Sequence, residues 1–140
     1  MGTANADVAR RLTEKVFLGG DLQAIDELLA EDFVSHDMPG GRPGTRDGFR
    51  DLARMVVGAF SERRMEFDEY IDTADGRVVE RWATLGRHTG AAFGLPPSGQ
   101  TVRARGIDIL RFADGKVVEH WGTIDMSDLF EKVQTGAPGS

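Results

Sequence analysis

A nine-residue phrase occurs twice in this chain. The first copy reads Ala74-Asp75-Gly76-Arg77-Val78-Val79-Glu80-Arg81-Trp82, and the second reads Ala113-Asp114-Gly115-Lys116-Val117-Val118-Glu119-His120-Trp121. In each copy Asp-Gly is a turn signal, and the residues after it are typical of a strand. The repeat therefore predicts two similar antiparallel hairpins in one sheet.

The loop length of the second hairpin decides which side chains meet. A two-residue loop sets Asp108 opposite Trp121, whereas a three-residue loop with Gly115 in the left-handed conformation sets Asp108 opposite His120. Under the three-residue register one face is apolar or small except for this acid and this imidazole. Its members are Val102, Ala104, Gly106, Asp108, Leu110, Val118, His120, Gly122 and Ile124. A half-buried sheet divides cleanly into two faces, so we predict this register.

The same rule assigns the faces of the first hairpin. One face is expected to carry Met65, Phe67, Glu69, Ile71, Val79, Arg81, Ala83 and Leu85, and the other face Glu66, Asp68, Tyr70, Glu80, Trp82 and Thr84. Trp82 and Trp121 then both lie on the outer face. Glu69 falls opposite Arg81, either as a structural ion pair or with the arginine free to orient a polar substrate.

Composition limits the class of protein. The net charge of −6 and the lack of a dense basic run argue against a nucleic-acid partner. Without cysteine, neither disulfides nor thiolate catalysis is possible. No apolar run reaches membrane-spanning length and no signal-peptide core is visible, so we expect a cytoplasmic protein with no membrane partner. The chain has three histidines and scattered carboxylates, but no ligand pair has a compact spacing such as His-x-His or His-Glu-x-x-His, and we expect neither metal nor cofactor.

The order of elements predicts the fold class. Helical spacing of apolar residues predicts helices around Val8 and after caps at Asp21 and Thr45, with a last helical turn after Ser127. A short extended piece is expected at 33–36. Helices grouped before an antiparallel sheet indicate a single α+β domain over residues 1–140, ordered from about 5 to 134, with a loose tail at 135–140.

Several segments, in this order, resemble the SnoaL-like polyketide cyclases of the nuclear transport factor 2-like superfamily. They are Asp32-Phe33-Val34-Ser35-His36, Gly86-Arg87-His88-Thr89-Gly90, Gly94-Leu95-Pro96-Pro97, Ile107-Asp108-Ile109-Leu110-Arg111, Asp114-Gly115-Lys116 and Glu119-His120-Trp121. The resemblance implies a cone-shaped, curved mixed sheet that helices close around an apolar pocket. It also implies a hydrophobic small-molecule substrate and a homodimer through the outer sheet face.

The resemblance also implies chemistry. Relatives close a polyketide ring by an aldol reaction in which a pocket aspartate removes a proton and a histidine assists. Those two positions fall on Gly122 and Asp108 here, so the usual base is missing. A non-aldol closure, such as oxygen-heterocycle formation or cycloaddition, is therefore a further possibility.

Another set of residues can supply acid–base chemistry in such a pocket. We interpret Asp108, His120 and His36 as catalytic candidates, because an apolar cavity and a neighbouring imidazole both tune a carboxyl group. The expected substrate-binding residues are Asp37, Arg81, Arg87, Met65, Phe67 and Leu110. Alternative readings are a buried structural pair at Asp108 and His120, a non-catalytic small-molecule binding protein, and an isomerase or epoxide hydrolase of the same fold.

Overall fold

The computed structural model describes residues 3–135. Its elements are α1 (Ala4–Arg11), the π-helical η1 (Leu12–Leu18), α2 (Ala24–Leu28), β1 (Leu29–Ser35), the 3-10 turn η2 (Pro39–Gly41), α3 (Arg46–Ala59), β2 (Phe60–Asp72), β3 (Val78–His88), β4 (Thr101–Ala113), β5 (Lys116–Asp125) and α4 (Ser127–Thr135). Of the tail predicted at 135–140, residue 135 belongs to α4 and the remainder lies outside the described residues.

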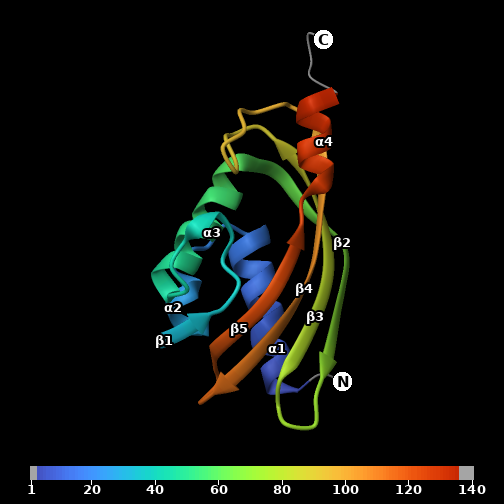
Figure 1. Ribbon diagram of the computed structural model, residues 1–140. Helices are drawn as coiled ribbons and strands as arrows, with labels where there is room; N and C mark the ends of the chain where they lie inside the picture. Colours follow the sequence, from blue (N-terminus) through green and yellow to red (C-terminus); the bar gives the residue numbers. More distant parts are fainter. Residues whose placement is uncertain (1–2, 136–140) are drawn as a thin grey trace.

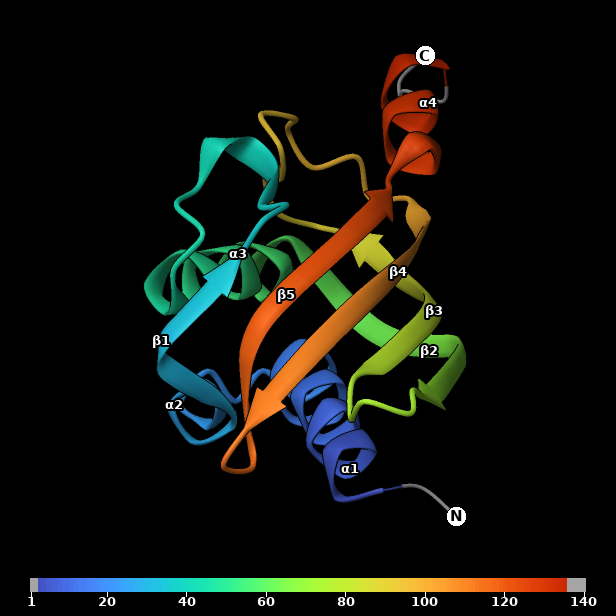
Figure 2. The ribbon, with the colours of Figure 1, turned by 60° about the horizontal axis from the view of Figure 1, so that its bottom comes forward.

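One curved five-stranded sheet forms one side of the molecule (Figure 1). Its strand order is β1-β5-β4-β3-β2, with β1 parallel to β5 and every other pair antiparallel. Figure 2 shows β1 beside β5, with α1 and α3 behind the sheet. The helices cover one face only, so the predicted α+β architecture with a curved mixed sheet is confirmed.

Side-chain capping sets the start of α3 but not the start of α2. The Thr45 hydroxyl accepts a hydrogen bond from Gly48 N at 3.1 Å, as an N-cap should, and confirms the predicted start of α3. The predicted cap at Asp21 is wrong. Helix α2 begins at Ala24 after Gln23, which provides no side-chain cap. A turn in which the Ala24 amide donates to the Asp21 carbonyl fills the interval.

The β4–β5 hairpin differs from the predicted register. Asp114 and Gly115 both have positive φ, which is the two-residue turn that Asp-Gly favours, and the predicted three-residue loop is wrong. A β-bulge follows at Val118, where the register shifts. Beyond the bulge Asp108 pairs with Gly122, and His120 lies diagonally from it on the same face.

The bulge preserves the predicted face of the second hairpin, apart from one residue. Turn and bulge together move the register by two, an even number, so Asp108 and His120 still share a face. Val117, not Val118 as predicted, is the buried core residue next to the turn, because the bulge takes up Val118.

The first hairpin has the predicted pairing but the opposite facing. Glu69 pairs with Arg81 as expected and forms an ion pair at 3.0 Å, with both side chains about half exposed. The predicted inward facing of Arg81 is wrong, because β3 pairs with β4 so that Trp82 is level with Gly106 and Glu80 with Asp108. Directly opposed residues share a face, so Glu80 and Trp82 point inward.

A second bulge separates two neighbouring side chains of β2. The register shifts between Met65 and Phe67, so the two face opposite sides. Met65 lies inside, as predicted, whereas Phe67 lies on the outer face under the guanidinium of Arg81, 4.5 Å from its ring centroid.

Candidate active site

An apolar cavity of about 160 Å³ lies between the inner sheet face and the helices. Aliphatic and aromatic side chains of η1, α3 and the strands supply most of its wall, including Leu12, Phe17, Phe49, Val56, Ala104 and Leu110. A cavity of about 150 Å³ holds one benzene molecule. The enclosed space therefore suits one ring of a ligand, with the remainder reaching toward the exterior.

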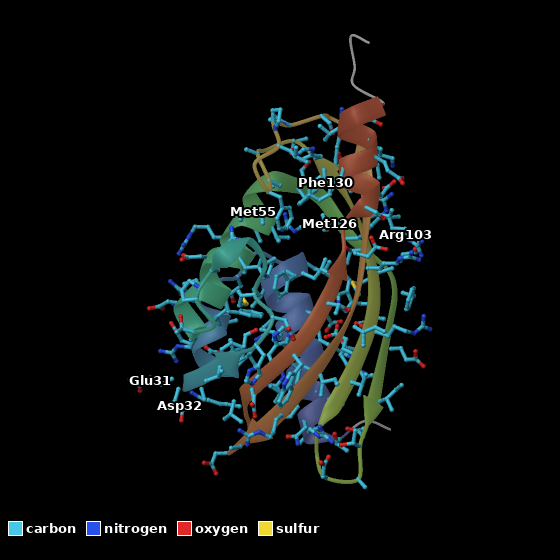
Figure 3. All side chains as sticks on the ribbon, viewed as in Figure 1. Glu31, Asp32, Met55, Arg103, Met126 and Phe130 are labelled. Carbon is cyan, nitrogen blue, oxygen red and sulfur yellow. The ribbon has the colours of Figure 1, made fainter. Side chains whose placement is uncertain are left out.

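Helix α3 and the segment that leads into α4 meet at the upper end of the molecule (Figure 3). Met55 of α3 and Met126 just before α4 belong to one apolar cluster there, and Met126 also lines the cavity. The cavity is therefore closed at this end by apolar side chains. Arg103 points away from the helices on the outer side of the sheet.

Asp108 and His120 form the polar centre of the cavity wall. His120 Nε2 lies 2.7 Å from Asp108 Oδ1, and their side chains are only 12% and 17% exposed. Both residues line the cavity. The structure therefore brings together the predicted acid and imidazole, although they come from diagonal rather than opposed positions.

Ser35 fixes the orientation of this imidazole from behind. Its Oγ lies 2.7 Å from His120 Nδ1, and its side chain is buried at the end of β1. When the imidazole is neutral, Nε2–H donates to the carboxylate and Nδ1 accepts the serine proton. Ser35 does not line the cavity, so it positions the histidine rather than facing a ligand.

Trp82 holds the other oxygen of the same carboxylate. Its Nε1–H donates to Asp108 Oδ2 at 2.7 Å. The indole lies close over β4, where a Cβ at Gly106 would come within 2.7 Å of the Trp82 ring. Sequence reasoning placed Trp82 on the wrong face. The signal that could have corrected it is Gly106, which leaves room for a large neighbour.

Gly122 is required by the space that Asp108 occupies. A Cβ at position 122 would overlap Asp108 Oδ1 and lie 2.8 Å from His120 Nε2. The Asp108 carboxylate thus fills the volume into which a side chain at 122 would project. The glycine at this position and the aspartate at 108 are two parts of one arrangement.

Glu80 and Asp68 add two more carboxyl groups behind Asp108. Glu80 is 5% exposed, lines the cavity and accepts a hydrogen bond from Thr13 Oγ1 at 2.7 Å. Burial raises the pKa of Glu80 to about 9, and the charges of Asp68 and Asp108 act in the same direction against the hydrogen bond from Thr13. Sequence reasoning assigned Glu80 no role.

The predicted site residue His36 lies outside the cavity, so its expected place beside Asp108 is wrong. Its Nε2 contacts Glu119 Oε2 at 2.6 Å, and its ring stacks on Trp121 with centroids 5.1 Å apart. Glu119 and Trp121 flank His120 in the chain and face the other way, because side chains alternate along β5.

The remaining predicted binding residues divide between the two faces. Asp37 lines the cavity at an exposed position, where its Oδ2 accepts the Gly122 amide at 3.0 Å. Met65 and Leu110 line the cavity as expected. Phe67 and Arg81 face outward, as described above. Arg87 is exposed, does not line the cavity and donates to the Gly99 carbonyl at 3.1 Å, so it anchors a loop.

Residues 3–135 contain neither a metal-binding cluster nor a membrane-spanning helix. No group of three or more histidine, aspartate or glutamate side chains is arranged to hold a metal ion there. Within the same range no helix is long and apolar enough to cross a membrane.

Fold and site together define a SnoaL-like protein, with a curved sheet and helices that enclose an apolar pocket. The family description "SnoaL-like polyketide cyclase" matches residues 7–133, and the chain belongs to this family. No curated protein matches the sequence significantly.

Solved structures share this fold across nearly their whole length. IdmH from Streptomyces antibioticus, described as a candidate polyketide cyclase, has a TM-score of 0.77 and 27% identity over 94% of this chain and 99% of its own. AclR from Streptomyces galilaeus, described as a candidate hydroxylase, has a TM-score of 0.80 and 26% identity over 93% of this chain and 95% of its own.

TsrD from Streptomyces laurentii is similar in fold alone. It reaches a TM-score of 0.80 at 21% identity, over 95% of this chain and 97% of its own. The different activities named for IdmH and AclR indicate that this fold serves more than one reaction.

Proposed function

We propose that this protein closes a ring in a polyketide-type substrate by acid–base catalysis, without a cofactor. Family membership supports the polyketide cyclase class. The observation that carries the proposal is the Asp108 carboxylate, which fills the space of a side chain at Gly122. The carboxylate that the family's aspartate would supply from position 122 is thus supplied from the neighbouring strand.

Asp108 acts as the base in this proposal. Trp82 N–H and His120 N–H each donate to one of its oxygens and hold the carboxylate plane, while each oxygen keeps a lone pair for a substrate proton. Proton transfer of this kind contributes about 10²–10⁴-fold to a rate. His120 is the second catalytic group, because its N–H donates to Asp108 and so stabilises the negative charge of the carboxylate.

The apolar wall supplies the remainder of the rate enhancement, because it holds the substrate in a folded conformation. Bringing two reacting ends together replaces an encounter with an intramolecular step, which can be worth about 7–11 kcal/mol. Met65 and Leu110 belong to this wall, and Asp37 is placed to bind a polar group of the substrate at its rim. The same constellation serves an aldol closure and an oxygen-heterocycle closure, because both begin with removal of a proton.

One observation favours a second candidate, a non-catalytic binding protein. The polar centre is small and fully hydrogen-bonded, and the remaining wall is apolar enough to hold a ligand without acting on it. The two candidates predict different results for the same variant.

Asp108→Asn separates them. With a panel of β-keto polyketide mimics, chromatography with mass detection follows ring closure and fluorescence quenching follows binding. We expect turnover to fall at least about 10²-fold in Asp108→Asn while binding stays within a few-fold. Glu69→Gln, a carboxyl-to-amide change on the outer face, is the matched control and should keep full turnover. Binding without turnover by the unmodified protein would support the binding protein instead.

The outer sheet face is the proposed contact for a second copy of the chain. Ile107 and Ile71 are 47% and 49% exposed there. The same face carries ion pairs, such as that of Arg103 with Glu66, so positive and negative groups alternate with apolar ones. A surface with mixed charges around exposed apolar groups can pair with itself about a two-fold axis. Light scattering should report a dimer, and Ile107→Glu should shift it to the monomer. A monomeric unmodified protein would contradict the dimer.

A further inference from the structure

Three carboxyl groups lie close together on the inner face of the sheet. Asp68 of β2, Glu80 of β3 and Asp108 of β4 come from neighbouring strands, with Glu80 level with Asp108 in the register and Asp68 diagonal to Glu80. Directly opposed side chains on adjacent strands have Cβ atoms about 4.5–5.5 Å apart. The diagonal pair of Asp68 and Glu80 is wider, at about 7–8 Å, and three ionised carboxylates this close in an apolar setting would repel each other strongly.

Asp68 and Glu80 have no cationic partner within residues 3–135. None of the ion pairs in this part of the chain involves either carboxyl group. The groups that face them are the Thr13 hydroxyl from η1, the Tyr70 hydroxyl from β2, and the Asp108–His120 pair from β4 and β5. Arg63 also lines the cavity, but its N–H groups donate to backbone carbonyls, including that of Phe17.

One oxygen of Asp68 has no donor to satisfy it. Tyr70 O–H donates to Asp68 Oδ2 at 2.5 Å, whereas Asp68 Oδ1 is buried without a partner. A buried acceptor of this kind is costly, and native structures rarely leave one unpaired. The Glu80 carboxyl is the neighbouring acid on the same face, diagonal to Asp68 across β2 and β3. A proton shared between the two carboxyl groups would give Asp68 Oδ1 a donor, because two ionised carboxylates can only accept hydrogen bonds.

We propose that Glu80 is a second catalytic acid of the site, held neutral by sharing its proton with Asp68 and positioned to deliver that proton to a substrate oxygen. This inference rests on the proposed function, since it gives the base Asp108 an acid partner. Burial, which raises the pKa of Glu80, acts in the same sense. Glu80 reaches the cavity surface, and Asp68 does not line it.

The proton balance closes within the site. Asp108 takes a proton from the carbon next to a substrate carbonyl, and the C–H electron pair becomes the new C=C bond. The carbonyl π pair moves to its oxygen, which receives the proton of Glu80 and becomes the enol hydroxyl. Glu80 is left ionised beside a now neutral Asp108, and transfer between these opposed neighbours restores the resting site.

The proton on Glu80 can be measured without a substrate. Carbon NMR of the full chain labelled at aspartate and glutamate carboxyls follows each group through a pH titration. We expect one glutamate signal to titrate well above the others, an aspartate signal to respond in the same step, and both features to vanish in Glu80→Gln. Glutamates that all titrate in the ordinary range would overturn the inference.

Benzoylacetone in heavy water tests the catalytic role, because exchange of its acidic protons for deuterium reports enolisation. We expect Asp108→Asn and Glu80→Gln each to slow exchange at least about 10²-fold, with KM changed little in Glu80→Gln. Asp68→Asn removes a charge that raises the pKa of Glu80, and it should move the alkaline limb of the rate profile to lower pH. This third variant tests the pair without altering Glu80 itself.

The outcomes distinguish the two proposals. Loss of exchange in Asp108→Asn with unchanged rate and pH profile in Glu80→Gln would overturn the role of Glu80 and leave the proposed function standing. Unchanged exchange in Asp108→Asn would contradict the proposed function itself, and with it the acid partner.

Discussion

The two copies of the repeated phrase occupy equivalent places in their hairpins and present opposite faces to the pocket. In the first copy Glu80 and Trp82 point inward and Arg81 outward. In the second copy the imidazole of His120 points inward, while Glu119 binds His36 on the other side. Near-identical strings of residues thus build opposite surfaces.

A single bulge explains the difference. Val78 and Val117 are equivalent residues after the two turns, and both are fully buried. The first strand continues with regular alternation, whereas the bulge at Val118 inserts one extra residue in the second. Because side chains alternate with period two, one extra residue exchanges the faces of everything that follows. The copies therefore supply different halves of one site.

Deleting Val118 should have the largest effect, because it gives the second copy the facing of the first. Glu119 would then enter the apolar pocket without its partners, and His120 would leave Asp108. An uncompensated buried charge costs about 3–5 kcal/mol, a large part of a typical total stability. Urea unfolding measures the loss, and Val118→Ala, which keeps the residue count, should cost far less. Equal stability of the deletion variant would contradict the role of the bulge.

Gly122→Asp should disrupt the pair next most strongly. The new Cβ would overlap Asp108 Oδ1, and overpacking costs typically about 1–3 kcal/mol. The double variant Gly122→Asp with Asp108→His places an acid and an imidazole at the positions that the family resemblance gives them. It should recover stability relative to the single variant, and a double-mutant cycle by urea unfolding measures the coupling. Additive losses would show that the two positions do not share space.

Glu80→Gln and Glu119→Gln compare the equivalent acids of the two copies. The pKa of Glu80 is raised in the folded state, so the folded protein binds more protons than the unfolded chain and stability falls as pH rises from about 5 to about 9. Glu80→Gln should remove this decline and stabilise the protein at pH 8 by on the order of 2 kcal/mol. Urea unfolding at pH 5 and pH 8 measures both slopes.

Glu119 should behave in the opposite sense. Hydrogen bonds from His36 and Arg111 lower the pKa of its carboxyl, so its contribution is present at neutral pH and lost in acid. Glu119→Gln should therefore be slightly destabilising at pH 7 and nearly neutral in acid. A parallel response of the two glutamine variants would contradict their opposite placement.

The two tryptophans provide the smallest and cleanest test. Trp82→Phe keeps an aromatic side chain but removes the N–H that holds Asp108, and it should cost about 1 kcal/mol of stability and roughly tenfold in turnover. Trp121→Phe makes the same chemical change on the outer face and should leave turnover unaltered. Matched kinetics and unfolding curves decide it, and an equal loss of turnover in both would argue against a specific role for Trp82.

Local signals predicted much of the fold and part of the site. The stripe of α3 and its cap at Thr45 depend on neighbours three and four residues apart, so the sequence contains the whole signal. The pairing within β2–β3 was predicted for the same reason, since a short turn joins the strands. The face that this hairpin presents was not, because it depends on how β3 pairs with β4 across the long connection at 89–100.

The residue types and the apolar alternation of β4 determined, without coordinates, that an acid and an imidazole share an apolar surface. Only the tertiary structure decided that Trp82 and Glu80 join them and that His36 does not. The physical reason is that strand register and bulges are set by packing between distant segments. A shift of one residue there reverses a whole face at little local cost.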